Sequence, residues 1–189
     1  MNIFVLDKSP ELAAAYHCDK HVVKMILESG QMLCTAHWTL GLESLGKQIN
    51  DFKRLRDAKS YILENLDSTK LPPWSMSHVR HPCTVWTSES SENYFWHMRL
   101  MRALLDEYTY RYDKKHKAEE AYDWLLKGPP KNIKNIGPTD HPQCMPDECK
   151  VINDPVAGYR NYYLKHKAYM AKWKKGNTPT WWKYEIESK

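Results

Sequence analysis

The sequence lacks the features of a membrane or secreted protein. No run approaches the ~18 consecutive apolar residues of a membrane-spanning helix. Asp7, Lys8 and Glu11 interrupt the first residues too early for a secretory signal. The 5 cysteines are an odd number without the spacing of a disulfide framework. We therefore expect reduced thiols in a cytoplasmic protein, without a membrane partner.

The sequence also lacks a complete metal-binding motif. Cys144 and Cys149 have no matching second pair of ligands. His17 and His21 are four residues apart, but the stretch between them lacks the glutamate of the zinc motif H-E-x-x-H. Three roles stay open for this histidine pair: binding a metal, contacting a phosphate, or orienting Glu28. The sequence favours no metal and no cofactor.

No internal repeat and no clear alternating strand pattern occurs along the chain. The length of 189 residues suits one domain, 1–189, which we predict to be all-α. A short extended apolar segment, 3–6, should precede the helices, and a basic aromatic helix and tail, 150–189, should follow them. Residues 128–149 are rich in proline, glycine and asparagine, which predicts an ordered surface loop.

Proline after a capping residue marks three expected helix starts, because proline suits the first helical position. Ser9-Pro10 should start one helix, with a break near Cys18 before the next. His81-Pro82 should start a helix that reaches Tyr112, and Asp154-Pro155 a helix that reaches Lys175. Two further helices are expected within 51–66 and over 117–126.

A narrow polar line is the main functional signal. On a helix at 3.6 residues per turn, polar side chains align with spacings of three and four, between apolar residues on both sides. They are His17, His21, Lys24, Glu28, Gln31 and Thr35. A buried helix that presents one reactive row to a cleft explains this pattern. An ordinary solvated edge with a Lys24–Glu28 pair is the alternative.

The positive charge is concentrated at the C-terminal end. The whole chain carries +5. Residues 150–189 contain nine Lys or Arg and three Asp or Glu, a balance of +6, so the rest is −1. A basic, aromatic segment on a neutral body predicts a nucleic-acid partner, because cations neutralise phosphates and aromatic rings stack on bases. The alternative is a surface helix whose aromatic side chains face the core.

Two further groups suggest chemistry at a phosphate-bearing substrate. The apolar segment 3–6 could hold the α-amino group of Met1 near Glu28. Amines attack carbon electrophiles and form Schiff bases, and a carboxylate can move the proton. Arg80 and His81 precede a helix start, where an anion is favoured by the helix dipole. Their alternatives are a solvated, inert N-terminus and a simple capped turn.

Six stretches carry a resemblance to a known family. They are NIFVLD, CDKHVVKMILE, HPCTVW, DEYTYRY, QCMPDE and DPVAGYRNYY. The chain resembles a family of small phage and bacterial proteins, which is in turn similar to the pyrimidine-dimer DNA glycosylases of the phage endonuclease V type. The match covers most of the chain, and residues 39–79 carry least of it.

The resemblance implies DNA repair by a glycosylase with abasic-site (AP) lyase activity. In that family the N-terminal amine attacks the sugar C1′ of a damaged nucleotide, forms a Schiff base and cuts the strand by β-elimination. Glu28 matches the essential helical glutamate, and His21 matches a histidine seven residues before it. Asn2 departs from the family's small second residue, which implies that Met1 stays and supplies the amine.

The resemblance further implies a monomer in the host cytoplasm that binds double-stranded DNA. By location, seven basic residues are candidates for phosphate contacts: Lys24, Arg80, Arg160, Lys165, Lys172, Lys174 and Lys175. Two alternatives stay open. One is a phage transferase that modifies DNA bases in the Glu28 cleft and leaves the strand uncut. The other is a non-catalytic DNA-binding protein in which the tail binds and the polar line is structural.

Overall fold

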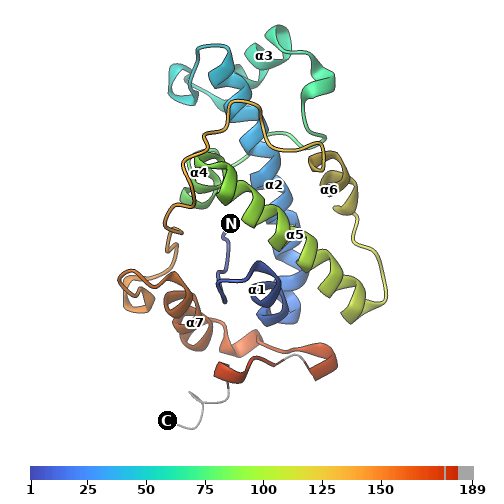
Figure 1. The fold of residues 1–189 in the computed structure, drawn as a ribbon, viewed down its shortest axis with the longest axis vertical. Helices are drawn as coiled ribbons and strands as arrows, with labels where there is room; N and C mark the ends of the chain where they lie inside the picture. The colour runs from blue at the N-terminus through green and yellow to red at the C-terminus, as the bar shows by residue number, and fades with distance from the viewer. Residues whose placement is uncertain (177, 183–189) are drawn as a thin grey trace.

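The computed structural model describes residues 1–176 and 178–182. It is an all-α fold, as the sequence predicted, and no strand occurs within the described ranges (Figure 1). Residue 177 and residues 183–189 of the predicted tail lie outside them. No helix in the described part is long and apolar enough to cross a membrane.

The N-terminal segment is extended and buried, as predicted. The side chains of Ile3, Phe4, Val5 and Leu6 are almost completely inaccessible to solvent. The chain then enters helix α1, Pro10–Tyr16, where the Ser9 hydroxyl accepts the Leu12 N–H at 3.4 Å and caps the first turn. The predicted break follows, and helix α2 spans Asp19–Ser44. His17 therefore lies outside α2, and the polar line on that helix begins at His21.

Helix α2 crosses helix α5, Ser91–Tyr112, at the centre of the molecule (Figure 1). Helix α4, Pro82–Glu89, packs beside both. The prediction of one continuous helix from His81 to Tyr112 is wrong. Ser90 has extended dihedral angles (φ −144°, ψ 157°), and its hydroxyl accepts the Asn93 N–H, so it ends α4 and caps α5. A serine favours such a cap over a helix interior.

The last predicted helix is also too long. Helix α7 spans Pro155–His166, not residues up to Lys175. Beyond it, the chain is held against the start of α2. The Lys172 carbonyl accepts the Asp19 N–H at 2.8 Å, and the Asp19 carboxylate accepts the Lys174 N–H at 3.0 Å. These long-range hydrogen bonds replace the helical ones.

The remaining elements lie at the periphery. Helix α3 spans Leu55–Asn65 and helix α6 spans Glu119–Leu125, both inside their predicted ranges. Short 3-10 turns occupy Ile49–Asp51, Ser68–Lys70, Asp147–Cys149, Ala168–Met170 and Lys174–Gly176. Residues 128–149 form the predicted loop, with only the turn at Asp147–Cys149. We refer to it as the 128–149 loop.

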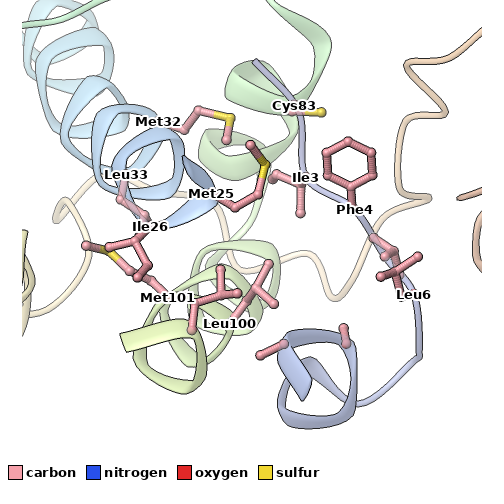
Figure 2. Packing of buried hydrophobic residues seen from close by; sticks show 14 of the residues in the cluster. Ile3, Phe4, Leu6, Met25, Ile26, Met32, Leu33, Cys83, Leu100 and Met101 are labelled. Carbon is pink, nitrogen blue, oxygen red and sulfur yellow. The ribbon is translucent and has the colours of Figure 1, made fainter. Parts of the chain in front are cut away.

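The main core surrounds the N-terminal segment. Figure 2 shows Ile3 beside Met25 of α2 and below Cys83 of α4, with Phe4 to its right and Leu100 of α5 below. A smaller cluster joins the C-terminal half of α2 to α3 through Trp38, Leu42 and Ile62. Because the first residues are packed inside the main core, the chain end is positioned by the fold rather than left in solvent.

A buried arginine ties α5 to the α1–α2 junction. The Arg111 side chain is 0% exposed and pairs with Asp19 at 3.1 Å and with Glu107 at 2.7 Å. It also donates to the backbone carbonyls of His17 at 2.7 Å and Ala15 at 2.9 Å. These carbonyls lie at the C-terminal end of α1, where a helix leaves acceptors unsatisfied. The guanidinium therefore closes that helix end inside the protein.

Two buried histidines should make the protein sensitive to mild acid. Burial, together with the nearby Arg111 cation, lowers the pKa of His17 to about 4. Burial lowers the pKa of His97 to about 3, with His141 adding to the effect. Each Nε2 is buried without a hydrogen-bond partner among the described residues. Both imidazoles are therefore neutral in the folded protein.

The free energy of unfolding should fall as the pH drops from about 6.5 toward 4. In this range the unfolded chain protonates both histidines and the folded protein does not, so the loss is roughly 2 kcal/mol per histidine between pH 6.5 and 5. Urea unfolding at several pH values measures the slope. The His97→Asn side chain can still bond to Thr87. This variant should reduce the slope of the unfolding free energy against pH by the contribution of about one proton. An unchanged slope would show that His97 does not contribute.

Candidate active site

The N-terminus and Glu28 meet inside the protein. The Met1 amine lies 3.8 Å from Glu28 Oε2, and the same oxygen accepts the Asn2 N–H at 2.8 Å. The Glu28 side chain is 10% exposed and that of Met1 2%. The Thr84 hydroxyl is 3.7 Å from the Met1 sulfur, so the Met1 side chain packs on α4 while its amine faces α2. The structure thus brings together the amine and the carboxylate that the sequence singled out.

The pair lies at a small cavity of about 190 Å³. Lys24 is at its edge, with Nζ 3.3 Å from Glu28 Oε1 and a largely exposed side chain. Ten residues line the cavity: Met1, Asn2, Phe4, His21, Lys24, Met25, Glu28, Cys144, Tyr162 and Lys167. Three members of the predicted polar line, His21, Lys24 and Glu28, therefore do share one concave site. Gln31 and Thr35 do not reach it, and Thr35 bonds to the backbone of Ser77 instead.

His21 is fixed at the wall of the cavity as a neutral ring. Its Nδ1 shares a 2.5 Å hydrogen bond with the Tyr163 hydroxyl, and its ring stacks on Phe4 at 4.3 Å between centroids. Burial lowers its pKa to about 2, and the electrostatic effects of His17, Lys167 and Lys24 act in the same direction. A neutral imidazole cannot act as a cation toward phosphate. The geometry therefore favours a role for His21 in orienting the neighbouring groups.

Asn2 positions the first residue of the chain. Its backbone N–H donates to Glu28, and its side-chain Nδ2 donates to the Cys144 carbonyl at 2.9 Å. Its Oδ1 accepts the Tyr159 hydroxyl at 2.7 Å. The side chain is buried. Asparagine at position 2 thus connects α2, α7 and the 128–149 loop, a role that nothing in the sequence indicated.

Two thiols and a histidine lie next to the N-terminus. Cys83 Sγ is 3.7 Å from Cys144 Sγ and donates to it, and this hydrogen bond lowers the pKa of Cys144 to about 7 while raising that of Cys83. His81 caps α4 by accepting the Cys83 N–H at 3.2 Å. Burial lowers the pKa of His81, and the positive charge of the N-terminal amine lowers it further. The charge of the Met1 amine therefore acts on the His81 ring.

The two candidate arginines bond to the protein itself. Arg80 donates to the Asn50 side chain at 3.1 Å, at the protein surface. Arg160 donates to the Leu6 carbonyl at 3.0 Å and pairs with Asp7 at 3.3 Å. Its guanidinium also lies 5.3 Å from the Trp181 ring centroid. Arg160 therefore stabilises the N-terminal segment in this structure.

The tail lysines are exposed but differ in their contacts. Lys165 donates to a backbone carbonyl at 2.7 Å, and Lys172 is exposed. Lys174 Nζ lies 4.5 Å from the Tyr112 ring centroid. Lys175 pairs with Asp113 and donates to the Tyr110 carbonyl. None of these four lysines lines the cavity at Glu28.

Lys167 is a basic cavity residue that the site prediction missed. It follows α7, and its Nζ lies 4.6 Å from the Tyr162 ring centroid. In the sequence it was one of several lysines in the basic segment, and only the end of α7 at His166 brings it to the cavity. Lys24 and Lys167 are thus the two lysines at the cavity.

Comparison of the chain with protein-family models, with curated proteins and with solved structures finds no match in any of the three.

Proposed function

We propose that the protein is a DNA glycosylase with AP-lyase activity that acts on damaged or modified pyrimidines through its N-terminal amine. The observation that carries this proposal is the Met1 amine 3.8 Å from the buried Glu28 carboxylate, in a cavity. An amine beside a buried carboxylate suits Schiff-base chemistry, because the amine must lose a proton before it attacks. Most N-termini instead lie in solvent.

The proposed reaction uses each of the two groups. Glu28 accepts a proton from the Met1 ammonium, and the free amine attacks C1′ of the damaged nucleotide. The N–C1′ bond forms as the glycosidic bond breaks, and the base leaves with the bonding electrons. Opening of the sugar ring gives a Schiff base. Loss of a C2′ proton then expels the 3′ phosphate, and water releases the protein.

The shape and charge of the cavity fit this proposal. A volume of about 190 Å³ is below the ~300–1,000 Å³ of ordinary ligand pockets and suits a single sugar-sized group. Lys24 and Lys167 at the cavity are cations that can contact flanking phosphates. The target nucleotide would have to leave the base stack, at a cost of a few kcal/mol.

Borohydride trapping tests the proposal. The protein is mixed with duplex DNA that carries an abasic site or ultraviolet photoproducts, and reductant is added. We expect a covalent adduct that peptide mapping places on residue 1, together with strand cleavage when the reductant is omitted. Intact mass of the purified protein checks that Met1 is retained.

Other outcomes distinguish the alternative functions. An altered base in an uncut strand, without an adduct, would indicate the DNA base-modifying transferase. Binding without any chemistry would indicate a DNA-binding protein. Either result would overturn the proposed glycosylase mechanism.

A further inference from the structure

Three potential metal ligands converge beside the N-terminal segment. They are His81 and Cys83 at the start of α4 and Cys144 in the 128–149 loop. One ligand atom from each lies within 4.8 Å of those of the other two. The three residues come from positions up to 63 apart in the sequence, so only the fold brings them together.

The separation of the two sulfur atoms fits a tetrahedral metal centre. With a Zn–S distance of about 2.3 Å and a tetrahedral angle, two thiolate ligands of one zinc ion are about 3.8 Å apart. The observed Cys83 Sγ to Cys144 Sγ distance is 3.7 Å. A disulfide would require about 2.05 Å instead, and both cysteines are free. The sulfur atoms thus need almost no movement to bind one ion.

The ligand types select the class of metal. Two thiolates and an imidazole are the ligands that zinc and other borderline-soft ions prefer, whereas magnesium and calcium prefer oxygen. We propose that His81, Cys83 and Cys144 bind one zinc ion, which keeps its fourth position for water or another ligand. Three protein ligands with an open position is a common zinc arrangement. The ligand thiols lose their protons on binding.

Because of the position of this site, a bound metal would affect how the first residues of the chain are held. Cys144 is the residue whose carbonyl accepts the Asn2 side chain, and Cys83 Sγ lies 3.5 Å from Asn2 Oδ1. A metal bound to both cysteines therefore joins the 128–149 loop to α4 around Asn2. Asn2 in turn bonds to Glu28. The ion would hold the first two residues in place whether or not Met1 performs the proposed chemistry.

A second group of three ligands provides the matched control. Glu148, Cys149 and His166 also converge within 4.8 Å. This group has one thiol, and His166 Nε2 and Glu148 Oε1 already form a 3.0 Å hydrogen bond. A site with two thiolates should bind zinc more tightly than this one. Cys149→Ser therefore separates the proposed site from general thiol binding.

The experiment measures metal content and cobalt spectra of the full chain. The protein is purified under reducing conditions, stripped with a chelator and titrated with zinc, with elemental analysis after desalting. We expect one zinc ion per chain. Cobalt in its place should give thiolate charge-transfer absorption and the intense visible bands of a tetrahedral centre. Neither readout depends on enzymatic activity, so the result stands apart from that of the trapping experiment.

Variants assign the ligands. Cys144→Ser and His81→Ala should weaken zinc binding by more than the ~10–100-fold typical of lost outer-shell partners, and Cys149→Ser should leave it unchanged. Cys144 and His81 are both partly exposed, so these variants test the site even if the buried Cys83→Ser does not fold. The proposal is overturned by wild-type protein that retains no zinc. Binding that Cys149→Ser abolishes and Cys144→Ser does not would overturn it as well.

Discussion

Glu28→Gln should reduce turnover on damaged duplex DNA by ~10²–10⁴-fold, the usual contribution of a general acid or base. The substitution keeps the shape of the side chain, and the amide oxygen can still accept the Asn2 N–H that Glu28 accepts at 2.8 Å. It removes the negative charge beside the Met1 amine and Lys24. Steady-state cleavage of a photoproduct-containing duplex measures the effect.

The control for this prediction is Glu64→Gln on α3. Glu64 is exposed and far along the chain from the cavity residues, so the variant makes the same chemical change without touching the site. We expect its turnover to match the wild type. DNA binding should be nearly the same for both variants, whereas Glu28→Gln should unfold at a lower temperature, because it leaves the buried Met1 amine without its negative partner. Full activity of Glu28→Gln would contradict the proposed mechanism.

Arg111→Met should be the most destabilising single substitution that we propose. Removing one partner of a buried ion pair costs ~3–5 kcal/mol, because the remaining charge stays buried without its partner. Here the loss also leaves the carbonyls of Ala15 and His17 without the guanidinium that they accept from. In a chain of this size the melting temperature should fall by roughly 10 °C. Thermal unfolding followed by circular dichroism measures the shift.

Arg99→Met, on the same helix, isolates the effect of burial. Arg99 pairs with Glu11 at 2.9 Å, as good a distance as in the Arg111 pairs, but both side chains are at least half exposed. Exposed pairs contribute ~0–1 kcal/mol, so the melting temperature should change by only a few degrees. Equal losses for the two variants would show that burial of Arg111 adds nothing.

The all-α class and most helix starts follow from local signals. Ser9-Pro10, Pro82 and Asp154-Pro155 each start a helix, because capping and proline geometry involve only neighbouring residues. Helix ends were predicted less well. Helix α7 ends at His166, and the chain that follows it is held by Asp19, more than 150 residues away in the sequence, which accepts the Lys174 N–H.

The candidate site also combines features set by neighbouring residues with features set by contacts between distant residues. The spacing of His21, Lys24 and Glu28 on one helix is a local property, and the apolar residues 3–6 indicated a buried chain start. The sequence alone therefore determined the helix row, and it suggested the chemistry that we propose. Tertiary structure decided the rest. It placed the Met1 amine at Glu28, made Asn2 the residue that holds it, and brought Lys167 to the cavity. It also brought Cys144 to Cys83. These contacts join residues distant in the chain, and core packing rather than residue spacing sets their distances.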